Sequence, residues 1–253
     1  MMGEYSAFVQ TYLREILQSG RFNIKDCQSR NLHLSQAYCL LWQNPETGEV
    51  TGRVSDEIIH DAAVAAILLD LAVRGYVELC IQEKTFMMKV GIVSQGVDVK
   101  VTNPTPTDTF LDKALFTRIL DSTMRSAGDW MIRTFSLKGG EVLTPILDSL
   151  VDQGIFSVES QSCMGRKYPI MNQGPKKELQ KELQMIALND HHADGFMWPL
   201  LKLARGVDAL ELGRAPILEH NFSDQDYNRA KKNIERLLKE GKPAETHKEN
   251  VKV

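Results

Sequence analysis

Two histidine-containing segments have the residue types that a catalytic or metal site needs. His191 and His192 lie between Asp190 and Asp194, and imidazole together with carboxylate suits a divalent metal ion. Adjacent residues point in different directions on a helix or a strand, however, and no third ligand is evident in the sequence. We therefore interpret this segment as a polar loop between helices and predict no metal site.

The second segment is the start of an expected helix, where Asp56 and Glu57 precede His60. A carboxylate and an imidazole one helical turn apart can serve as an acid and base pair. The same spacing is common on the polar face of an ordinary helix start, and we favour that interpretation. The sequence also contains no GxSxG, P-loop, GxGxxG or HExxH motif. We predict no catalytic residue and no cofactor, and an enzyme built around His60, or around His191 and His192, ranks last among the alternatives.

Basic residues stand in expected loops before the two most apolar helices. Arg53 precedes one of these helices, Lys138 precedes the other, and Arg166 and Lys167 lie near the tip of an expected hairpin. If the two helices are neighbours, their N-termini and the loops that lead to them lie close together. Two positive helix ends beside Arg53 and Lys138 would suit a phosphate. The alternative is that these residues are scattered, solvated charges.

The composition is that of an ordinary globular protein. The chain has 253 residues, of which 43% are hydrophobic and 25% are charged, and its formal net charge is −3. These values disfavour a disordered chain and a protein that generally coats nucleic acid. The apolar run from Ala62 to Val73 is interrupted by Asp70, so we expect no membrane span and, at most, peripheral membrane association. The four cysteines are widely spaced and the N-terminus lacks the pattern of a secretion signal, which predicts a cytoplasmic protein with reduced thiols.

A repeated pattern predicts the two central helices. The sequence ILLDLAVRGYVELCIQ at Ile67–Gln82 has a counterpart at Ile146–Val158, ILDSLVDQGIFSV, with an offset of 79 residues. In both copies an apolar helix ends at a glycine, Gly75 or Gly154, and apolar residues follow. A glycine just past a helix can adopt the left-handed conformation that closes the last turn. We expect a helix, a tight turn and a hairpin in each copy.

The remaining elements follow from hydrophobic spacing and caps. The expected helices are Tyr5–Gln18, Leu32–Trp42, Asp56–Val73, one from a cap at Asp108 or Thr109 through Leu120, a short one carrying Trp130 and Ile132, Thr144–Gly154 with Thr144 as cap and Pro145 in the first position, Lys176–Leu188, Trp198–Ala204 and Ser223–Leu238. Expected strands are a short one at Val50–Val54, a hairpin of Tyr76–Gln82 with Phe86–Val93 turning at Glu83–Thr85, a further short strand with Val97, Val99 and Val101, and a second hairpin of Ile155–Ser160 with Lys167–Met171 turning at Met164 and Gly165. Ser223 with Asp226 forms the expected capping box of the last helix, and Phe222 with Tyr227 its hydrophobic staple.

The order of these features resembles the Golgi phosphoprotein 3 family. The matching segments are ILLDLAVRGYVEL, PTDTFLDKAL, ILDSLVDQGIFSVES, LLKLARGVDAL followed by APIL, and SDQDYNRAKKNIERLL, which together span about Leu32 to Leu238. The resemblance implies a mainly α fold, with a single globular helical domain and two or three protruding β-hairpins. We divide the chain into an N-terminal helix and joint at 1–30, a Golgi phosphoprotein 3-like domain at 31–240 and a charged flexible tail at 241–253.

The resemblance also implies a function and a site. Family members are adaptors without known enzymatic activity that recognise phosphatidylinositol 4-phosphate on Golgi membranes and retain membrane proteins through their cytoplasmic tails. The family's headgroup positions, counted without gaps, read Ser55, Val64, Gly140 and Leu143, none of which is basic or aromatic. Either Arg53 and Lys138 replace the family's basic residues from nearby, or phosphoinositide specificity is lost in this chain.

The sequence therefore yields two leading hypotheses. The first is a peripheral adaptor on the cytosolic face of Golgi membranes, with Arg53, Ser55, Lys138 and Gly140 at an anionic phosphoinositide headgroup and cytoplasmic tails of membrane proteins as partners. The second is a soluble interaction module of the same fold that has lost the lipid site. In either case the resemblance implies self-association through the second hairpin, and no nucleic acid is expected as a partner. The hairpin residues expected to mediate it are Cys163, Met164, Gly165, Arg166, Lys167 and Tyr168.

Overall fold

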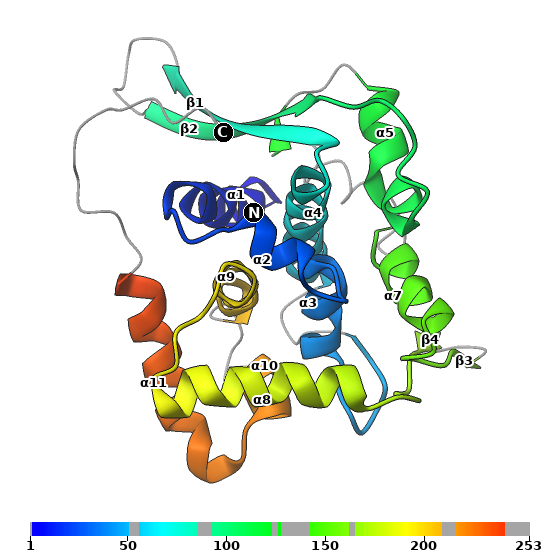
Figure 1. Ribbon diagram of the computed structural model, residues 1–253, viewed down its shortest axis with the longest axis vertical. Coiled ribbons are helices and arrows are strands. Elements are labelled where there is room, and N and C mark those ends of the chain that lie inside the picture. Colours follow the sequence, from blue (N-terminus) through cyan, green and yellow to red (C-terminus); the bar gives the residue numbers. More distant parts are fainter. Residues whose placement is uncertain are drawn as a thin grey trace.

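A buried helix, α4 (Asp56–Val73), stands at the centre of the fold (Figure 1). Every residue from Ala62 to Leu69 is fully buried, as expected for a helix that is apolar on all sides. Helices α1 (Met2–Gln18), α3 (Leu34–Trp42) and α9 (Met197–Asp208) pack around it. The computed structural model describes residues 2–50, 56–85, 93–122, 126–127, 142–161, 165–208 and 216–240. The expected bounds of α4 are confirmed, and the architecture is mainly α.

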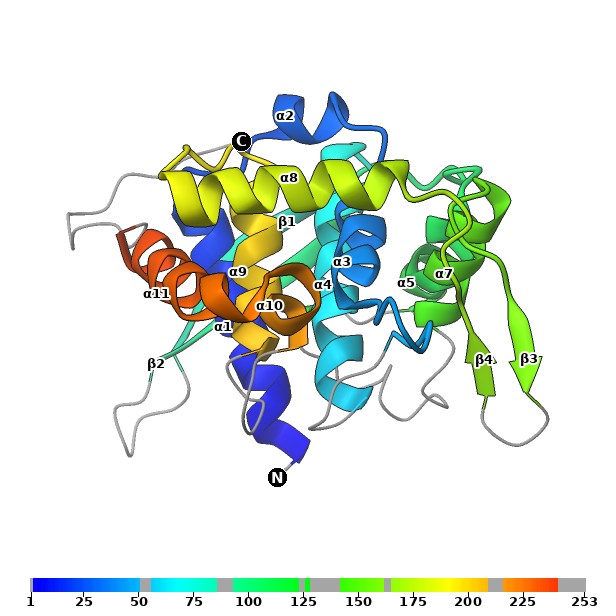
Figure 2. The same ribbon diagram turned by 90° about the horizontal axis from the view of Figure 1, so that it is seen from below.

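A second group of helices closes the core on the side of α3 and α9. Helix α8 (Gly174–Asn189) crosses the upper side of the molecule in Figure 2 and packs against α11 (Asp224–Glu240) and α3. The short helices α2 (Ile24–Gln28) and α10 (Pro216–Asn221), which the sequence pattern does not indicate, join the longer ones. Gly174 and Pro175 open α8, since proline is tolerated in a first helical turn.

The start of α11 agrees with the expected capping box. The Ser223 hydroxyl donates to Asp226 Oδ2 at 2.8 Å and accepts from the Asp226 N–H at 3.3 Å. Farther along α11, Arg229 and Asn233 donate to the carbonyl oxygens of Leu188 and Ala187 at 2.5 and 2.7 Å. These bonds satisfy carbonyls in the last turn of α8, which have no partner within their own helix. Helix α11 therefore begins where the sequence predicts and caps its neighbour.

The first hairpin differs from the expected one. Strand β1 (Val77–Thr85) pairs antiparallel with β2 (Val93–Val101), and Val77 lies opposite Val101. The expected turn at Glu83–Thr85 is therefore wrong, because these residues continue β1. The expected pairing with Phe86–Val93 is also wrong, since the partner is the segment that contains Val97, Val99 and Val101. Val97 and Val99 are buried, and this contact with the helical core selects the partner strand.

Helix α7 (Leu143–Asp152), expected to be the second central helix, instead lies at the edge of the molecule, packs against α3 and leads into the second hairpin (Figure 1). Its N-cap is Val142, so the expectation that Thr144 caps the helix is wrong; Thr144 lies within the first turn together with Pro145. Strands β3 (Glu159–Gln161) and β4 (Gly165–Lys167) pair antiparallel, and Phe156 forms a further bridge with Ile170. Gly165 lies opposite Gln161 in β4, so the expectation that Gly165 belongs to the turn is wrong, and Met164 lies outside the described residues. Within the described residues, the strands form two sheets of two strands each.

Both helix-ending glycines have the expected conformation. Gly75 has a φ of +75° and Gly154 a φ of +68°, which is the left-handed region that favours glycine. The segment after the first hairpin contains a π-helical stretch, η1 (Asp112–Phe116), followed by α5 (Thr117–Leu120). The Thr109 hydroxyl accepts from the Leu111 N–H at 3.3 Å, in agreement with the expected cap. The expected short helix with Trp130 and Ile132, and most of the expected strand at Val50–Val54, lie outside the described residues.

Candidate functional site

The first turn of α3 is held by a carboxylate from α4. Asp70 accepts three hydrogen bonds there, from the Leu34 N–H at 2.8 Å, the Ser35 N–H at 3.0 Å and the Ser35 hydroxyl at 2.7 Å. These N–H groups have no partner within α3, and negative charge is favourable at a helix N-terminus. Burial raises the pKa of Asp70, although His33 and these hydrogen bonds act in the opposite direction. Asp70 thus fixes α3 against the C-terminal half of α4.

The same turn of α3 contacts α7 through Gln36. The Gln36 Nε2 donates to the Ser149 hydroxyl at 2.9 Å, and Ser149 donates in turn to the Ile146 carbonyl at 2.6 Å. The Gln36 Oε1 accepts from the His33 N–H at 3.0 Å. Gln36 is fully buried and Ser149 nearly so. Three consecutive residues of α3 therefore contact both α4 and α7, and this turn is called the α3 junction below.

The α3 junction contacts the C-terminal halves of both α4 and α7. Asp70 lies near the C-terminal end of α4, and Ser149 lies in the C-terminal half of α7, yet both contact the first turn of α3. The C-terminal halves of α4 and α7 therefore both lie beside the first turn of α3. At a rise of about 1.5 Å per residue, α4 begins about 21 Å and α7 about 9 Å from this turn.

Several chain segments meet on one side of the molecule. Figure 2 shows the start of α1, the start of α4 and the projecting ends of the β1–β2 and β3–β4 hairpins along the lower side of the molecule. Helix α8 lies on the opposite side in this view. We call the side with the helix starts and hairpin ends the N-terminal face. It gathers helix N-termini, which attract anions, and hairpins that project from the helical core.

The predicted headgroup residues fall largely beyond the described ranges. Arg53, Ser55, Lys138 and Gly140 are not among the described residues, so their positions remain predictions. The other two family positions are described, and Val64 is fully buried in α4 while Leu143 is buried at the start of α7. Helix α4 begins three residues after Arg53 and α7 begins five residues after Lys138.

The described residues of the second hairpin contact their own chain. The Arg166 Nη1 lies 3.4 Å from Asp148 Oδ1, and the Lys167 Nζ lies 3.9 Å from Glu49 Oε1. Tyr168 is buried and packs against Phe156, with 6.3 Å between ring centroids. Burial raises the pKa of Tyr168. Cys163 and Met164 lie outside the described ranges, and Gly165 opens β4.

A buried lysine holds the base of this hairpin. The Lys176 Nζ donates to the backbone oxygen of Gln43 at 2.7 Å and to its Oε1 at 2.9 Å. The Gln43 Nε2 donates to the Tyr168 carbonyl at 3.3 Å, and the Tyr168 N–H donates to the Gly48 carbonyl at 2.8 Å. Burial lowers the pKa of Lys176 to about 8. The first turn of α8, the end of α3 and the second hairpin are thereby joined.

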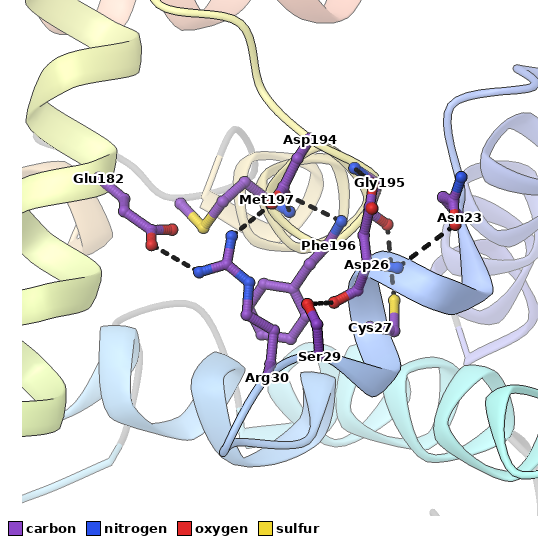
Figure 3. A network of polar contacts seen from close by, with 10 residues as sticks. All are labelled: Asn23, Asp26, Cys27, Ser29, Arg30, Glu182, Asp194, Gly195, Phe196 and Met197. Carbon is purple, nitrogen blue, oxygen red and sulfur yellow. Dashed lines mark hydrogen bonds and ion pairs between the residues drawn. The ribbon is translucent and has the colours of Figure 1, made fainter.

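The segment with the two histidines belongs to a structural network (Figure 3). Arg30 pairs with Glu182 of α8 and with Asp194, and its guanidinium lies 5.0 Å from the ring centroid of Phe196. Asp194 also accepts from the N–H groups of Phe196 and Met197, at 3.0 and 2.7 Å, and so caps α9. Burial acts to raise the pKa of Asp194, but the Met197 N–H and Arg30 outweigh it and the pKa is lowered.

The carboxylates beside the two histidines are therefore engaged elsewhere. Asp190 pairs with Arg236 at 2.5 Å, and Asp194 is occupied by Arg30 and the start of α9. Across the described ranges, no group of three or more His, Cys, Asp and Glu side chains is arranged to hold a metal ion. The interpretation of this segment as an interhelical loop agrees with these contacts.

Sequence reasoning did not identify the α3 junction. Asp70 does indicate a buried polar contact in the sequence, because a carboxylate inside an apolar helix requires buried partners. Gln36 and Ser149 carried no signal, since 113 residues separate them and each is an ordinary helical residue.

Comparisons with known proteins agree with the architecture. The sequence model of the family described as Golgi phosphoprotein 3 (GPP34) matches residues 34–252. A search of curated proteins finds no match. Among the described residues, no helix is both long enough and apolar enough to cross a membrane. Because the family match spans well over half of the sequence, the chain belongs to the Golgi phosphoprotein 3 family.

Proposed function

We propose that this protein is a peripheral membrane adaptor that binds the headgroup of phosphatidylinositol 4-phosphate on the cytosolic face of Golgi membranes. It retains or sorts membrane proteins there by holding their cytoplasmic tails, without catalysing a reaction. Family membership supports the general role. The lipid, the tails and the Golgi location are the parts of the proposal that require experiment.

The observation that carries the proposal is the N-terminal face. The start of α4 lies on this side of the molecule, together with the start of α1 and the projecting ends of both hairpins (Figure 2). Helix N-termini favour an anionic group through their free N–H groups and their dipole. Arg53 precedes α4 by three residues, and Lys138 precedes α7 by five. A five-residue segment reaches up to about 17 Å, which limits how far Lys138 can lie from the start of α7.

Liposome flotation tests the proposal directly. We expect the full chain to float with vesicles that contain phosphatidylinositol 4-phosphate and to bind less to vesicles of equal charge that contain phosphatidylserine. Arg53→Ala and Lys138→Ala should each weaken binding about tenfold or more, since a hydrogen bond to a charged group contributes about 1.5–3 kcal/mol. Lys181→Ala is the matched control, because Lys181 is exposed on α8, away from the N-terminal face. Unchanged binding by both variants would refute the headgroup site, and absence of any vesicle binding would refute the lipid function.

Exposed apolar side chains favour a second candidate, an interaction module that works without lipid. Beside the second hairpin, Met171 is 70% exposed and Val158 is 46% exposed. Large apolar side chains in such positions are common at protein contacts. If this candidate is correct, the chain forms an oligomer in the absence of lipid, and Met171→Glu with Val158→Glu dissociates it in light scattering. A monomeric wild-type chain at high concentration would exclude self-association through this hairpin.

A further inference from the structure

We propose that the outer edge of β1 is a self-association surface, and that the β1 strand of a second copy of this chain pairs with it. The two strands run antiparallel about a two-fold axis beside Ile81, so that the two first hairpins form one four-stranded sheet. This inference does not depend on lipid binding. It also uses a different surface from the second hairpin.

One edge of β1 is paired with β2 and the other edge is free. The Thr102 N–H donates to the carbonyl of Tyr76, its opposite residue in the register, at 3.0 Å. Bonded positions alternate along an antiparallel pair, so the even-numbered residues of β1 bond to β2 and the odd-numbered residues direct their N–H and carbonyl groups outward. Among the described residues, Leu79 and Ile81 make no backbone hydrogen bond outside the ladder. Their outward groups are therefore available to another strand.

Strand β1 itself has no feature that blocks this edge. Its register with β2 continues without a bulge over all nine residues, and it contains no proline, although bulges and prolines commonly protect free edges. The outer edge of β2, in contrast, forms a bridge from Asp98 to Ser126. Ile81 is 37% exposed, whereas Val97 opposite it is fully buried. The free edge thus offers backbone hydrogen bonds together with an apolar side chain, as edges that accept an added strand do.

The sequence of β1 is complementary to itself in the antiparallel direction. A two-fold axis beside Ile81 places position 78 of each copy opposite position 84 of the other, so that the acidic Glu78 faces the basic Lys84 twice. The side chain of Glu78 is 39% exposed. Moving the axis by one residue in either direction places Glu78 opposite Gln82 or beyond the end of the strand. Opposite charges directly across a sheet are stabilising, so this charge pattern selects the register about Ile81.

Charge exchange tests this register. Glu78→Lys and Lys84→Glu each convert two attractive pairs into two repulsive ones, and we expect each variant to self-associate about tenfold more weakly, or less, in sedimentation velocity. A mixture of the two variants pairs every lysine with a glutamate across the axis and should form heterodimers. The double variant should again form homodimers, which also shows that the substituted chains are folded.

A proline substitution tests the backbone contribution. Ile81→Pro removes an outward N–H that does not bond to β2, and proline is tolerated at such a position of an edge strand. We expect Ile81→Pro to abolish self-association, whereas Ile81→Val keeps the N–H and should retain it. Circular dichroism confirms that each variant is folded, and the charge exchange decides the matter if Ile81→Pro is not.

Two controls separate this surface from other contacts. Lys100→Ala removes the partner of Glu78 within the chain, at 3.1 Å, and should not weaken the dimer. Met171→Glu with Val158→Glu alters the second hairpin and should also leave the dimer intact. A monomeric wild-type chain, single charge variants that associate as the wild type does, or a mixture that stays monomeric would each overturn the inference. Dissociation by Met171→Glu with Val158→Glu would overturn it as well, because it would assign self-association to the second hairpin.

Discussion

Burying the Lys176 ammonium group costs folding free energy, and this cost depends on pH. Its partners among the described residues are the two oxygens of Gln43, which carry no formal charge. Removing an ammonium group from water is unfavourable unless an opposite charge compensates it. Burial accordingly lowers the pKa of Lys176 to about 8. The residue contributes less to stability at neutral pH than its hydrogen bonds alone suggest.

This lowered pKa predicts that stability increases in alkaline solution. Below about pH 8 Lys176 is protonated in both states, and above its unfolded-state pKa of about 10.4 it is neutral in both. Between these values the unfolded state binds more protons, so the free energy of unfolding rises with pH, by on the order of 2–3 kcal/mol in total. Urea denaturation at pH 7, 9 and 10.5 should show this rise for the wild type relative to Lys176→Met.

The neighbouring lysine provides the control. Lys177 is exposed in the same turn of α8, so Lys177→Met should retain the wild-type pH dependence. If the free energy of unfolding changes with pH in parallel for the wild type and Lys176→Met, then Lys176 titrates as an exposed lysine does.

At the scale of elements, the contact between α2 and the start of α9 requires a glycine. The Asn23 N–H donates to the Gly195 carbonyl at 3.3 Å, and the Gly195 N–H donates to Asp26 Oδ2 at 2.8 Å (Figure 3). A Cβ on Gly195 would lie 2.2 Å from Asn23 Cβ and 2.7 Å from Asp26 Oδ2. We expect Gly195→Ala to lower the free energy of unfolding by about 1–3 kcal/mol or more, as overpacking does elsewhere.

Gly96→Ala is the comparison for this measurement. Gly96 lies in β2, and a Cβ there would meet no atom within 4 Å. Its substitution should change the urea midpoint little, or raise it by restricting the unfolded chain. Equal losses in the two variants would mean that the close approach of α2 to Gly195 does not limit stability.

The elements differ in how far the sequence could predict them. Helix α4 was predictable because its apolar run, its acidic start and Gly75 are local signals. The first hairpin was not, because Phe86–Val93 and Val93–Val101 both alternate, and only packing against the helices decides which one pairs with β1. The candidate site likewise combines features that the sequence predicts with a contact that it does not predict. The helix starts that would bind an anion follow from local patterns, whereas the bond between Gln36 and Ser149 depends on tertiary contact.

At the scale of the whole molecule, the N-terminal helix is part of the core. The family match begins at residue 34, after the N-terminal helix and joint expected at 1–30. In the structure Leu13 and Ile16 of α1 are fully buried, and α1 packs against both α4 and α9. Glu15 forms an ion pair with Lys202 of α9, and the Lys202 Nζ lies 5.4 Å from the Tyr12 ring centroid. These contacts predict that α1 unfolds together with the rest of the protein.

A pair of leucine variants tests this cooperativity. Leu13 in α1 and Leu183 in α8 are both fully buried, so replacing either by alanine should cost about 2–5 kcal/mol. If the molecule is one cooperative unit, each variant shifts a single urea transition, and far-ultraviolet circular dichroism and tryptophan fluorescence report the same midpoint. If α1 unfolds separately, Leu13→Ala leaves the main transition in place while Leu183→Ala still moves it. If both variants shift the same transition, α1 stays folded whenever α4 is folded, because α1 packs directly on α4.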